Sequence, residues 1–180
     1  PSALVPSPYF LAPAWWGNYT REMRTLSRRR SWADRKWKVL FRGSCGPGAA
    51  ERLKLLDLAR HEKRFDFKFV GFIGNYSSLQ HCVSSVAPGA NLSHFADRKL
   101  SLGGYSEYRY LLHMPGAATG SYSRNLQHLF MHGSIILVWQ SSALEWYYPL
   151  LRDRVHYLAV NASTITAVLD DVERNATLRN

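Results

Sequence analysis

The chain has 180 residues, 46% of them hydrophobic, and a formal net charge of +10 at pH 7. This length allows one domain with a sizeable core and is short for two. No apolar run approaches the roughly 20 residues that a membrane-spanning helix needs, and no signal peptide stands at the start. The charge favours an anionic partner, such as a nucleic acid, acidic lipid headgroups or a phosphorylated small ligand. Because the chain begins with Pro1 rather than Met, we expect it to be part of a longer protein.

The cysteines and asparagines indicate a cellular compartment. Two cysteines, Cys45 and Cys82, exclude a disulfide framework and leave a single bridge open. Five asparagines satisfy the N-glycosylation rule, which is more than chance usually gives in this length. Together the sequons favour the lumen of the secretory pathway. They begin at Asn18, Asn75, Asn91, Asn161 and Asn175.

The first third of the chain predicts an arm followed by a strand, a loop and a helix. Residues 1–31 are expected to form an N-terminal arm or linker, with a short polar helix from Asn18 to Arg30. Residues 36–41 alternate polar and apolar side chains, which predicts a strand. A glycine-rich loop, residues 42–48, then precedes a predicted helix over residues 49–60. The loop lacks the glycine order of a P-loop or of a dinucleotide-binding fingerprint.

The remaining pattern predicts one α/β domain over residues 32–180. A strand over 66–72 is followed by an irregular connection over 74–104, which contains one helical turn. Strands and helices then alternate, and this alternation predicts a Rossmann-like parallel sheet with helices on both faces. The later predicted strands span 108–113, 134–139 and 155–160; the predicted helices span 123–132, 143–151 and a last segment capped by Ser163.

The junction after the strand 108–113 is a candidate phosphate site. Its small-residue loop leads into a predicted helix, so backbone N–H groups and the positive end of the helix dipole would converge on one point. Arg124, in the first turn of this predicted helix, could donate bidentate hydrogen bonds to an anionic oxygen. In parallel sheets, ligands bind beyond the carboxyl ends of the strands, where this loop and the loop 42–48 would both lie.

Six ordered blocks of residues carry a family resemblance from Trp32 to the end of the chain. They are Phe41-Arg42-Gly43-Ser44 with Arg52-Leu53, Tyr108–Leu112 with Gly116, Ser123-Arg124, Ser134–Leu137, Glu145–Tyr148 and His156–Val160. In order and spacing they resemble glycosyltransferase family 90, the protein O-glucosyltransferase and capsule-associated protein family. The resemblance implies an inverting, metal-independent transferase of GT-B architecture in the endoplasmic reticulum or Golgi lumen. Its donor would be a UDP-sugar, UDP-glucose or UDP-xylose in the better-known members, and its acceptor a protein or glycan hydroxyl.

The same resemblance implies roles for individual residues. Arg42 and Arg124 would face the nucleotide diphosphate of the donor. Without a metal, such cations and helix N-termini must neutralise the charge that develops on the leaving UDP. Glu145 would accept hydrogen bonds from ribose or sugar hydroxyls. The neighbouring donor-binding residues would be Gly43, Ser44, Arg52 and Ser123.

The chain also departs from the family pattern. Phe41 stands where a Trp usually precedes Arg-Gly, and Trp139-Gln140 follows the buried strand where many members have Lys or His. These departures leave the choice of sugar and acceptor open. The family's catalytic carboxylate lies in the N-terminal half, upstream of the region that Pro1 begins. We therefore expect this chain to be the C-terminal, donor-binding half of a two-domain enzyme.

Two other functions remain open at this point. A non-catalytic or degenerate relative that binds a carbohydrate or nucleotide explains the same residues. A basic nucleic-acid-binding domain explains the charge and the aromatic residues but not the sequons or the ordered blocks, so we expect no nucleic-acid partner. No pair of histidines has a third ligand at a recognised metal-site spacing. We therefore expect no metal and no cofactor, the UDP-sugar being a co-substrate.

Overall fold

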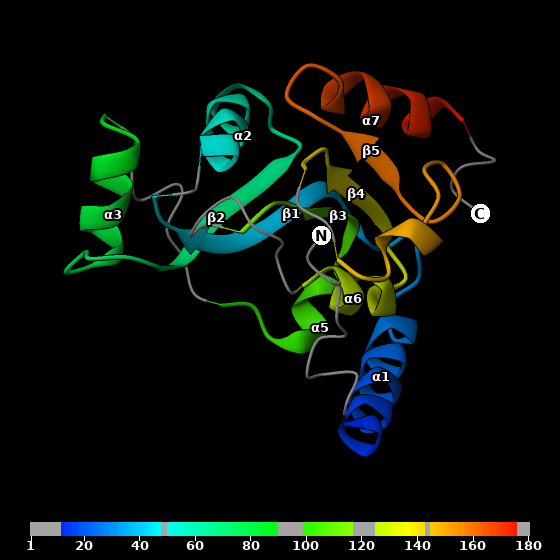
Figure 1. The fold of residues 1–180 in the computed structure, drawn as a ribbon. Helices are drawn as coiled ribbons and strands as arrows, with labels where there is room; N and C mark the ends of the chain where they lie inside the picture. Colours follow the sequence, from blue (N-terminus) through cyan, green and yellow to red (C-terminus); the bar gives the residue numbers. More distant parts are fainter. Residues whose placement is uncertain (1–11, 48–49, 90–98, 117–124, 143–144, 176–180) are drawn as a thin grey trace.

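A parallel five-stranded sheet forms the centre of the molecule, in the order β2-β1-β3-β4-β5 (Figure 1). This computed structural model describes residues 12–47, 50–89, 99–116, 125–142 and 145–175. All four pairs of neighbouring strands are parallel, which confirms the predicted sheet. The strands are β1 (Lys36–Cys45), β2 (Phe65–Phe72), β3 (Tyr108–His113), β4 (Ile135–Trp139) and β5 (Leu158–Val160).

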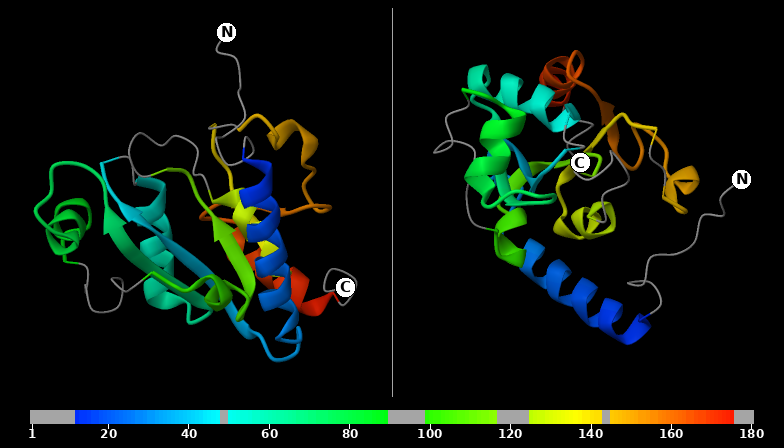
Figure 2. Two further views of the ribbon diagram at one scale, coloured as in Figure 1. Left: turned by 90° about the horizontal axis from the view of Figure 1, so that it is seen from below. Right: turned by 60° about the vertical axis from the view of Figure 1, so that its left-hand side comes forward.

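Helices cover both faces of this sheet, as the alternating pattern predicted (Figures 1 and 2). Two helices, α2 (Ala50–His61) and α7 (Ile165–Arg174), lie over one face. The opposite face carries α5 (Leu102–Tyr105) and α6 (Leu126–Leu129), which continues into the 3-10 helix η2 (Phe130–His132). Each of the first four strands is followed by a crossover that returns the chain to the same end of the sheet, and this keeps the strands parallel.

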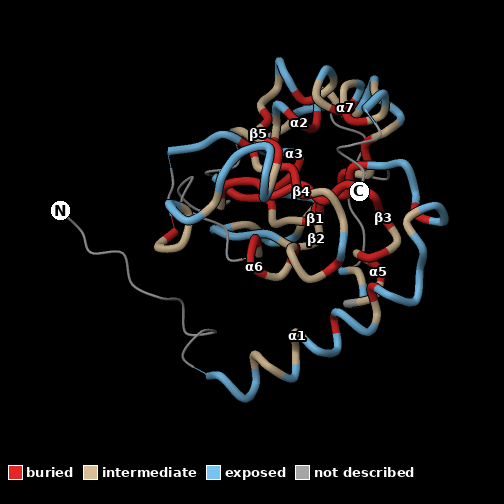
Figure 3. The backbone as a smooth tube through the Cα atoms, turned by 90° about the vertical axis from the view of Figure 1, so that its right-hand side faces the viewer, coloured by how far each residue is buried: buried red, intermediate tan, exposed pale blue. Residues whose placement is uncertain are grey.

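Two apolar clusters fill the space between the sheet and its helices. Leu55 of α2 and Leu169 of α7 are completely buried against one face, as the predicted helical stripes required. On the other face, Leu126 packs against Leu111 and Ile136. Figure 3 shows the burial concentrated along the strands, with the outer sides of the helices exposed. The sheet is thus buried on both faces, which explains its continuous runs of apolar residues.

The N-terminal region contains a longer helix than the sequence suggested. Helix α1 spans Pro13–Arg28 and so begins five residues before the predicted start at Asn18. Pro13 favours this start, because its fixed φ suits the first helical position and its missing N–H costs no helical hydrogen bond there. The predicted extended arm falls mostly on residues 1–11, outside the described residues. None of the described helices is long and apolar enough to cross a membrane.

Strand β1 runs further than predicted. Arg42, Gly43 and Ser44 were expected in a loop, but they belong to the strand. Their backbone pairs with β2, and the register shifts between Gly43 and Ser44. The prediction was wrong here because pairing with a neighbouring strand outweighs the low strand propensity of glycine and serine.

Two predictions near the C-terminus were also wrong. The segment 145–151 is not α-helical as far as it is described; it contains the 3-10 helix η3 (Tyr148–Leu150). Pro149 has no N–H to donate to Glu145, so the turn closes through shorter-range bonds such as Tyr148 N to Glu145 O at 3.0 Å. Strand β5 begins at Leu158 and not at Val155, because a turn at Arg154, with φ of 58°, precedes it.

The connection between β2 and β3 is more ordered than predicted. It contains α3 (Leu79–Val86), whose first turn is capped by the Ser78 hydroxyl. A disulfide joins Cys45, at the end of β1, to Cys82 in α3, with a Cα–Cα distance of 6.2 Å. The bridge that the sequence left open is therefore formed, and it fixes α3 to the carboxyl end of the sheet.

Candidate functional site

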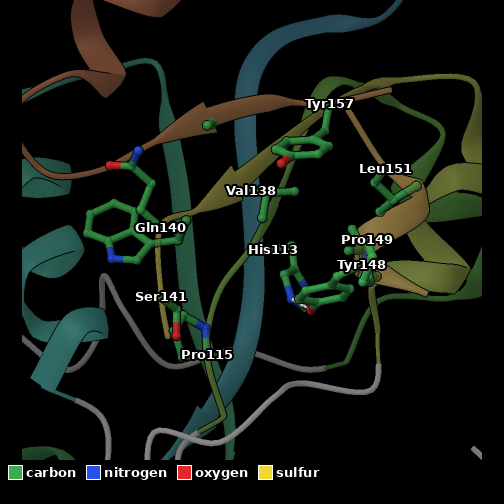
Figure 4. Close-up of a pocket in the computed structure, with 12 residues that line it drawn as sticks. His113, Pro115, Val138, Gln140, Ser141, Tyr148, Pro149, Leu151 and Tyr157 are labelled. Carbon is green, nitrogen blue, oxygen red and sulfur yellow. Dashed lines mark hydrogen bonds between the residues drawn. The ribbon is translucent and has the colours of Figure 1, made fainter. Parts of the chain in front are cut away.

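A cavity of about 500 Å³ opens at the carboxyl ends of β3 and β4 (Figure 4). This is the edge at which Rossmann-like sheets bind their ligands. His113 ends β3, Gln140 follows β4, and the segment around Tyr148 closes the opposite wall. Val138, Leu151 and Tyr157 give the cavity a largely apolar lining. It therefore suits a flat, uncharged ring with a few polar atoms.

A hydrogen-bond chain fixes the polar side chains of this cavity. His113 is 3% exposed, and burial lowers its pKa to about 4, helped by the charge of Arg52. The imidazole is therefore neutral at pH 7. Its Nδ1 donates to Asn125 Oδ1 at 2.7 Å, so its Nε2 accepts from the Tyr148 hydroxyl at 2.8 Å. The Tyr148 oxygen remains able to accept a hydrogen bond from a ligand.

Tyr148 is also kept neutral. Burial raises the pKa of its hydroxyl, and the nearby carboxylate of Glu145 raises it further. Glu145 is itself buried, with 5% of its surface exposed, and it does not line the cavity. The polar side chains of His113 and Tyr148 are thus uncharged at pH 7, and a diphosphate would find no compensating charge on either of them.

Arg52 brings a positive charge close to the cavity. Its guanidinium donates to Pro115 O through Nε and Nη2, at 3.0 and 2.6 Å, and to Ser44 O through Nη1. These bonds tie the end of β1 to the segment that follows β3. Burial lowers the pKa of Arg52 to about 10, so it stays charged at pH 7. No described carboxylate forms an ion pair with it, which leaves its charge to attract an anion.

Arg42 does not line this cavity. Its side chain is 4% exposed and forms an ion pair with Asp66 of β2 at 2.8 Å. Nη1 donates to the carbonyl oxygens of Phe41 and Asp66. Gly43 is needed for close packing, because a Cβ there would lie 2.5 Å from the Phe41 ring. The contacts of Arg42 thus join β1 to β2.

The glycine-rich loop before α2 is a poor phosphate site. Glu51 lies in the first turn of α2, where its carboxylate accepts from Lys54 at 2.7 Å and from Trp139 Nε1 at 2.9 Å. These hydrogen bonds lower the pKa of Glu51, so it is ionised at neutral pH. A negative charge at this position opposes phosphate binding. The junction after β3, which the sequence indicated as a phosphate site, is the better candidate, but Ser123 and Arg124 lie outside the described residues.

None of the five described residues that the sequence assigned to the site lines the cavity. Arg52 and Glu145 lie behind its walls, whereas Arg42, Gly43 and Ser44 belong to β1. The predicted set of donor-binding residues did not include the lining residues that carry polar side-chain atoms, although Trp139 and Gln140 are among the departures from the family pattern. Their positions in the sequence could have indicated them, because they lie at or after the end of a predicted strand or shortly before the following strand. These residues are His113, Trp139, Gln140, Ser141, Tyr148 and Tyr157.

The described part of the chain contains no group of three or more His, Cys, Asp or Glu side chains that could hold a metal ion. His132 is buried against Ser106, with 3.0 Å between its Nδ1 and the serine hydroxyl. Metal independence stays a prediction.

The sequence model of the family described as Glycosyl transferase family 90 matches residues 14–176. This chain belongs to glycosyltransferase family 90. The match covers all five strands and confirms the resemblance that the ordered blocks indicated.

Curated members of family 90 are similar over most of the chain. Protein O-glucosyltransferase 1 of Homo sapiens is 26% identical over 163 residues, which cover 89% of this chain and 38% of the relative. The O-glucosyltransferase rumi homolog of Aedes aegypti is 24% identical over 157 residues, covering 87% of this chain and 36% of the relative. The family-90 chain described here thus spans well under half the length of these relatives.

A solved structure shares the fold. The crystal structure of Anabaena HepE in complex with UDP and glucose superimposes with a TM-score of 0.51 at 9% identity. The match covers 88% of the family-90 chain and 44% of HepE. At this identity the likeness shows the fold, an α/β architecture with a parallel sheet, and not the residues of a binding site.

Proposed function

We propose that this chain is the donor-binding half of an inverting, metal-independent transferase that moves glucose, or a related sugar such as xylose, from a UDP-sugar to a hydroxyl of a protein or glycan. The cavity at the carboxyl ends of β3 and β4 carries this proposal, because it combines an apolar lining with the buried charge of Arg52 nearby. Two comparisons support it. The curated relatives are named O-glucosyltransferases, and the HepE crystals contain UDP and glucose.

The donor would bind with its base in the cavity and its diphosphate toward Arg52 and Arg124. The neutral side chains of His113 and Tyr148 suit a base better than a phosphate, as argued above. In the transfer step the acceptor oxygen forms a bond to the anomeric carbon, and the bond from that carbon to UDP breaks. Positive side chains stabilise the charge that grows on the leaving UDP. The base that takes the acceptor's proton would come from the preceding half of the protein.

Titration of UDP into the chain tests this proposal, in a buffer with EDTA and without metal. We expect saturable binding, and we expect Arg124→Gln to weaken it by about 1.5–3 kcal/mol, the usual contribution of a hydrogen bond to a charged group. Calorimetry measures both quantities. Arg60→Gln is the matched control, because it removes the same charge from an exposed position on α2.

Two results would contradict the proposed donor site. One is the absence of binding heat from a chain whose circular dichroism shows a folded state. The other is an equal loss of affinity in the Arg124 and Arg60 variants, because general attraction to a positive surface would then explain the binding.

We also propose that the protein works in the lumen of the endoplasmic reticulum or Golgi. The disulfide between Cys45 and Cys82 requires an oxidising compartment to persist. Asn75 is exposed just after β2, at a turn where Gly74 has a φ of 115°. Its amide is therefore free of the packing that would oppose a bulky glycan.

Expression in a eukaryotic secretory host tests this location. We expect an N-glycan on Asn75, so that treatment with peptide N-glycosidase lowers the mass of the secreted chain and Asn75→Gln removes one glycan from the mass spectrum. The same chain made in the cytosol is the control and should not change on treatment. An unmodified Asn75 peptide from the secreted chain would argue against this site.

A further inference from the structure

The side-chain amide of Asn161 has one defined orientation. It follows β5, and its Oδ1 accepts hydrogen bonds from the backbone N–H groups of Ser163 and Thr164 at 2.9 and 3.1 Å. A backbone N–H can only donate, so the atom that faces these two groups must be the oxygen. The amide nitrogen of Asn161 must then point the other way.

This orientation determines that of Gln140. Asn161 Nδ2 lies 2.6 Å from Gln140 Oε1. Because an amide nitrogen only donates, Gln140 must present its oxygen to Asn161 and turn its own nitrogen away from it. The backbone N–H of Gln140 also donates to Val160 O at 2.8 Å, which holds the residue at the end of β4.

Gln140 is part of the cavity wall (Figure 4). One lone pair of its oxygen accepts from Asn161, and no described residue accepts a hydrogen bond from its Nε2. The polar atom that Gln140 turns away from Asn161 and can offer a ligand is therefore the donor Nε2. A ligand group beside it would be recognised if it accepts a hydrogen bond and disfavoured if it can only donate.

We propose that Gln140 is a specificity-determining residue that selects a uracil base over a cytosine base, through a hydrogen bond from Nε2 to the carbonyl oxygen at C4 of the base. The assignment rests on the proposed UDP-sugar site. Uracil carries a carbonyl oxygen at C4, whereas cytosine carries an amino group there, which donates. The neighbouring Val138 and Tyr157 supply apolar and aromatic surface against which a flat base can pack. The diphosphate and ribose are the same in both nucleotides, so only the base distinguishes them.

Asn161 acts as a positioning residue in this arrangement. It touches no part of the proposed ligand, yet it decides which atom of Gln140 faces the cavity. Asn161→Asp keeps an oxygen for the N–H groups of Ser163 and Thr164 but places a second oxygen toward Gln140. Gln140 would then turn its nitrogen toward residue 161 and present its oxygen to the ligand.

Titrations of UDP and of CDP into the chain and two variants test this inference. For the unchanged chain we expect UDP to bind roughly three- to tenfold more tightly than CDP, as one hydrogen bond at an exposed position allows. Gln140→Glu replaces the donor by an acceptor of the same shape, and Asn161→Asp reverses the amide. We expect each to lower the UDP-to-CDP affinity ratio to one or below. The added negative charge repels both nucleotides equally, so it cancels in the ratio.

The outcomes separate this inference from the donor site itself. Equal binding of UDP and CDP by the unchanged chain, or an unchanged ratio in both variants, would overturn the role of Gln140 and leave the donor site standing. A chain that binds neither nucleotide would overturn both. A ratio that moves in Gln140→Glu but not in Asn161→Asp would overturn the positioning role of Asn161.

Discussion

Replacing Arg42 by alanine is expected to lower the free energy of unfolding by about 3–5 kcal/mol, the usual cost of breaking a buried ion pair on one side. The side chains of Arg42 and Asp66 are 4% and 18% exposed. Without Arg42 the Asp66 carboxylate would keep the hydrogen bond from Tyr108 but lose its counter-charge. Urea denaturation followed by circular dichroism measures the loss.

A double substitution provides the control for this prediction. Arg42→Met with Asp66→Leu removes both charges and fills the space with apolar atoms, so we expect it to recover most of the lost stability. Lys36→Ala breaks the exposed pair with Glu107 and should cost no more than about 1 kcal/mol. If the double variant were as unstable as Arg42→Ala, the side-chain packing of Arg42 and not its charge would be responsible.

The same pair predicts how stability depends on pH. Burial raises the pKa of Asp66, but the hydrogen bond from Tyr108 and the charge of Arg42 outweigh it and hold this pKa below its ordinary value. The unfolded chain then binds the proton more readily than the folded one. The contribution of Asp66 is therefore fully present above about pH 4, near the ordinary pKa of an aspartate, and is lost as the pH falls further. The stability difference between the unchanged chain and Asp66→Asn should shrink only in that acid range.

Because Arg42 forms a buried ion pair, the UDP affinity of Arg42→Ala does not measure a contact with the donor alone. Its terminal nitrogens already bind Asp66 and two carbonyl oxygens, so Arg42→Ala would weaken UDP binding through the fold as well as through any contact. Arg124→Gln gives the cleaner measurement of the diphosphate site. The role of Arg42 toward the diphosphate stays a prediction.

Loss of the disulfide between Cys45 and Cys82 is expected to lower the free energy of unfolding by about 2–4 kcal/mol. The bridge spans 37 residues of sequence, including α2 and β2, and both cysteines are completely buried. Opening it allows the unfolded chain many more conformations while the folded chain gains few. Urea denaturation of Cys45→Ser with Cys82→Ser, compared with the unchanged chain, measures this effect.

Reduction provides an independent control for the disulfide. Dithiothreitol should shift the denaturation midpoint of the unchanged chain toward that of the double serine variant, and should leave the variant itself unaffected. A midpoint of the unchanged chain that does not respond to complete reduction would contradict the expected stabilisation.

The sequence predicted most of the fold because the signals for it are local. The alternation of side chains predicted a strand over 66–72, and β2 spans Phe65–Phe72. The helical spacing of Ile165, Leu169 and Val172 matches the buried side of α7. Gly133 directly follows the predicted helix 123–132, and it has the left-handed φ of 63° that commonly ends a helix. The local pattern failed in two places. Residues 42–44 were predicted to form a loop, but pairing with β2 extends β1 through them. A helix was predicted over residues 143–151, but Pro149 has no N–H for the helical hydrogen bond.

The candidate site was less accessible to sequence reasoning. The blocks that carry the family resemblance pointed to the carboxyl ends of the strands, where the cavity lies, yet none of the described members of the predicted set lines it. The lining residues come from β3, β4 and β5 and from the two crossovers between them. Their residue types alone do not distinguish a cavity wall from a core.

The sequence by itself determined the positions of the five strands along the chain, the parallel sheet and the membership in family 90, since periodicity and ordered blocks are read along the chain. Only the tertiary structure decided which side chains share a site. Arg42 meets Asp66 across two strands, Arg52 reaches the carbonyl of Pro115, and Asn161 orients Gln140. These contacts depend on strand register and on the direction of each side chain, and both are fixed only when distant segments pack together.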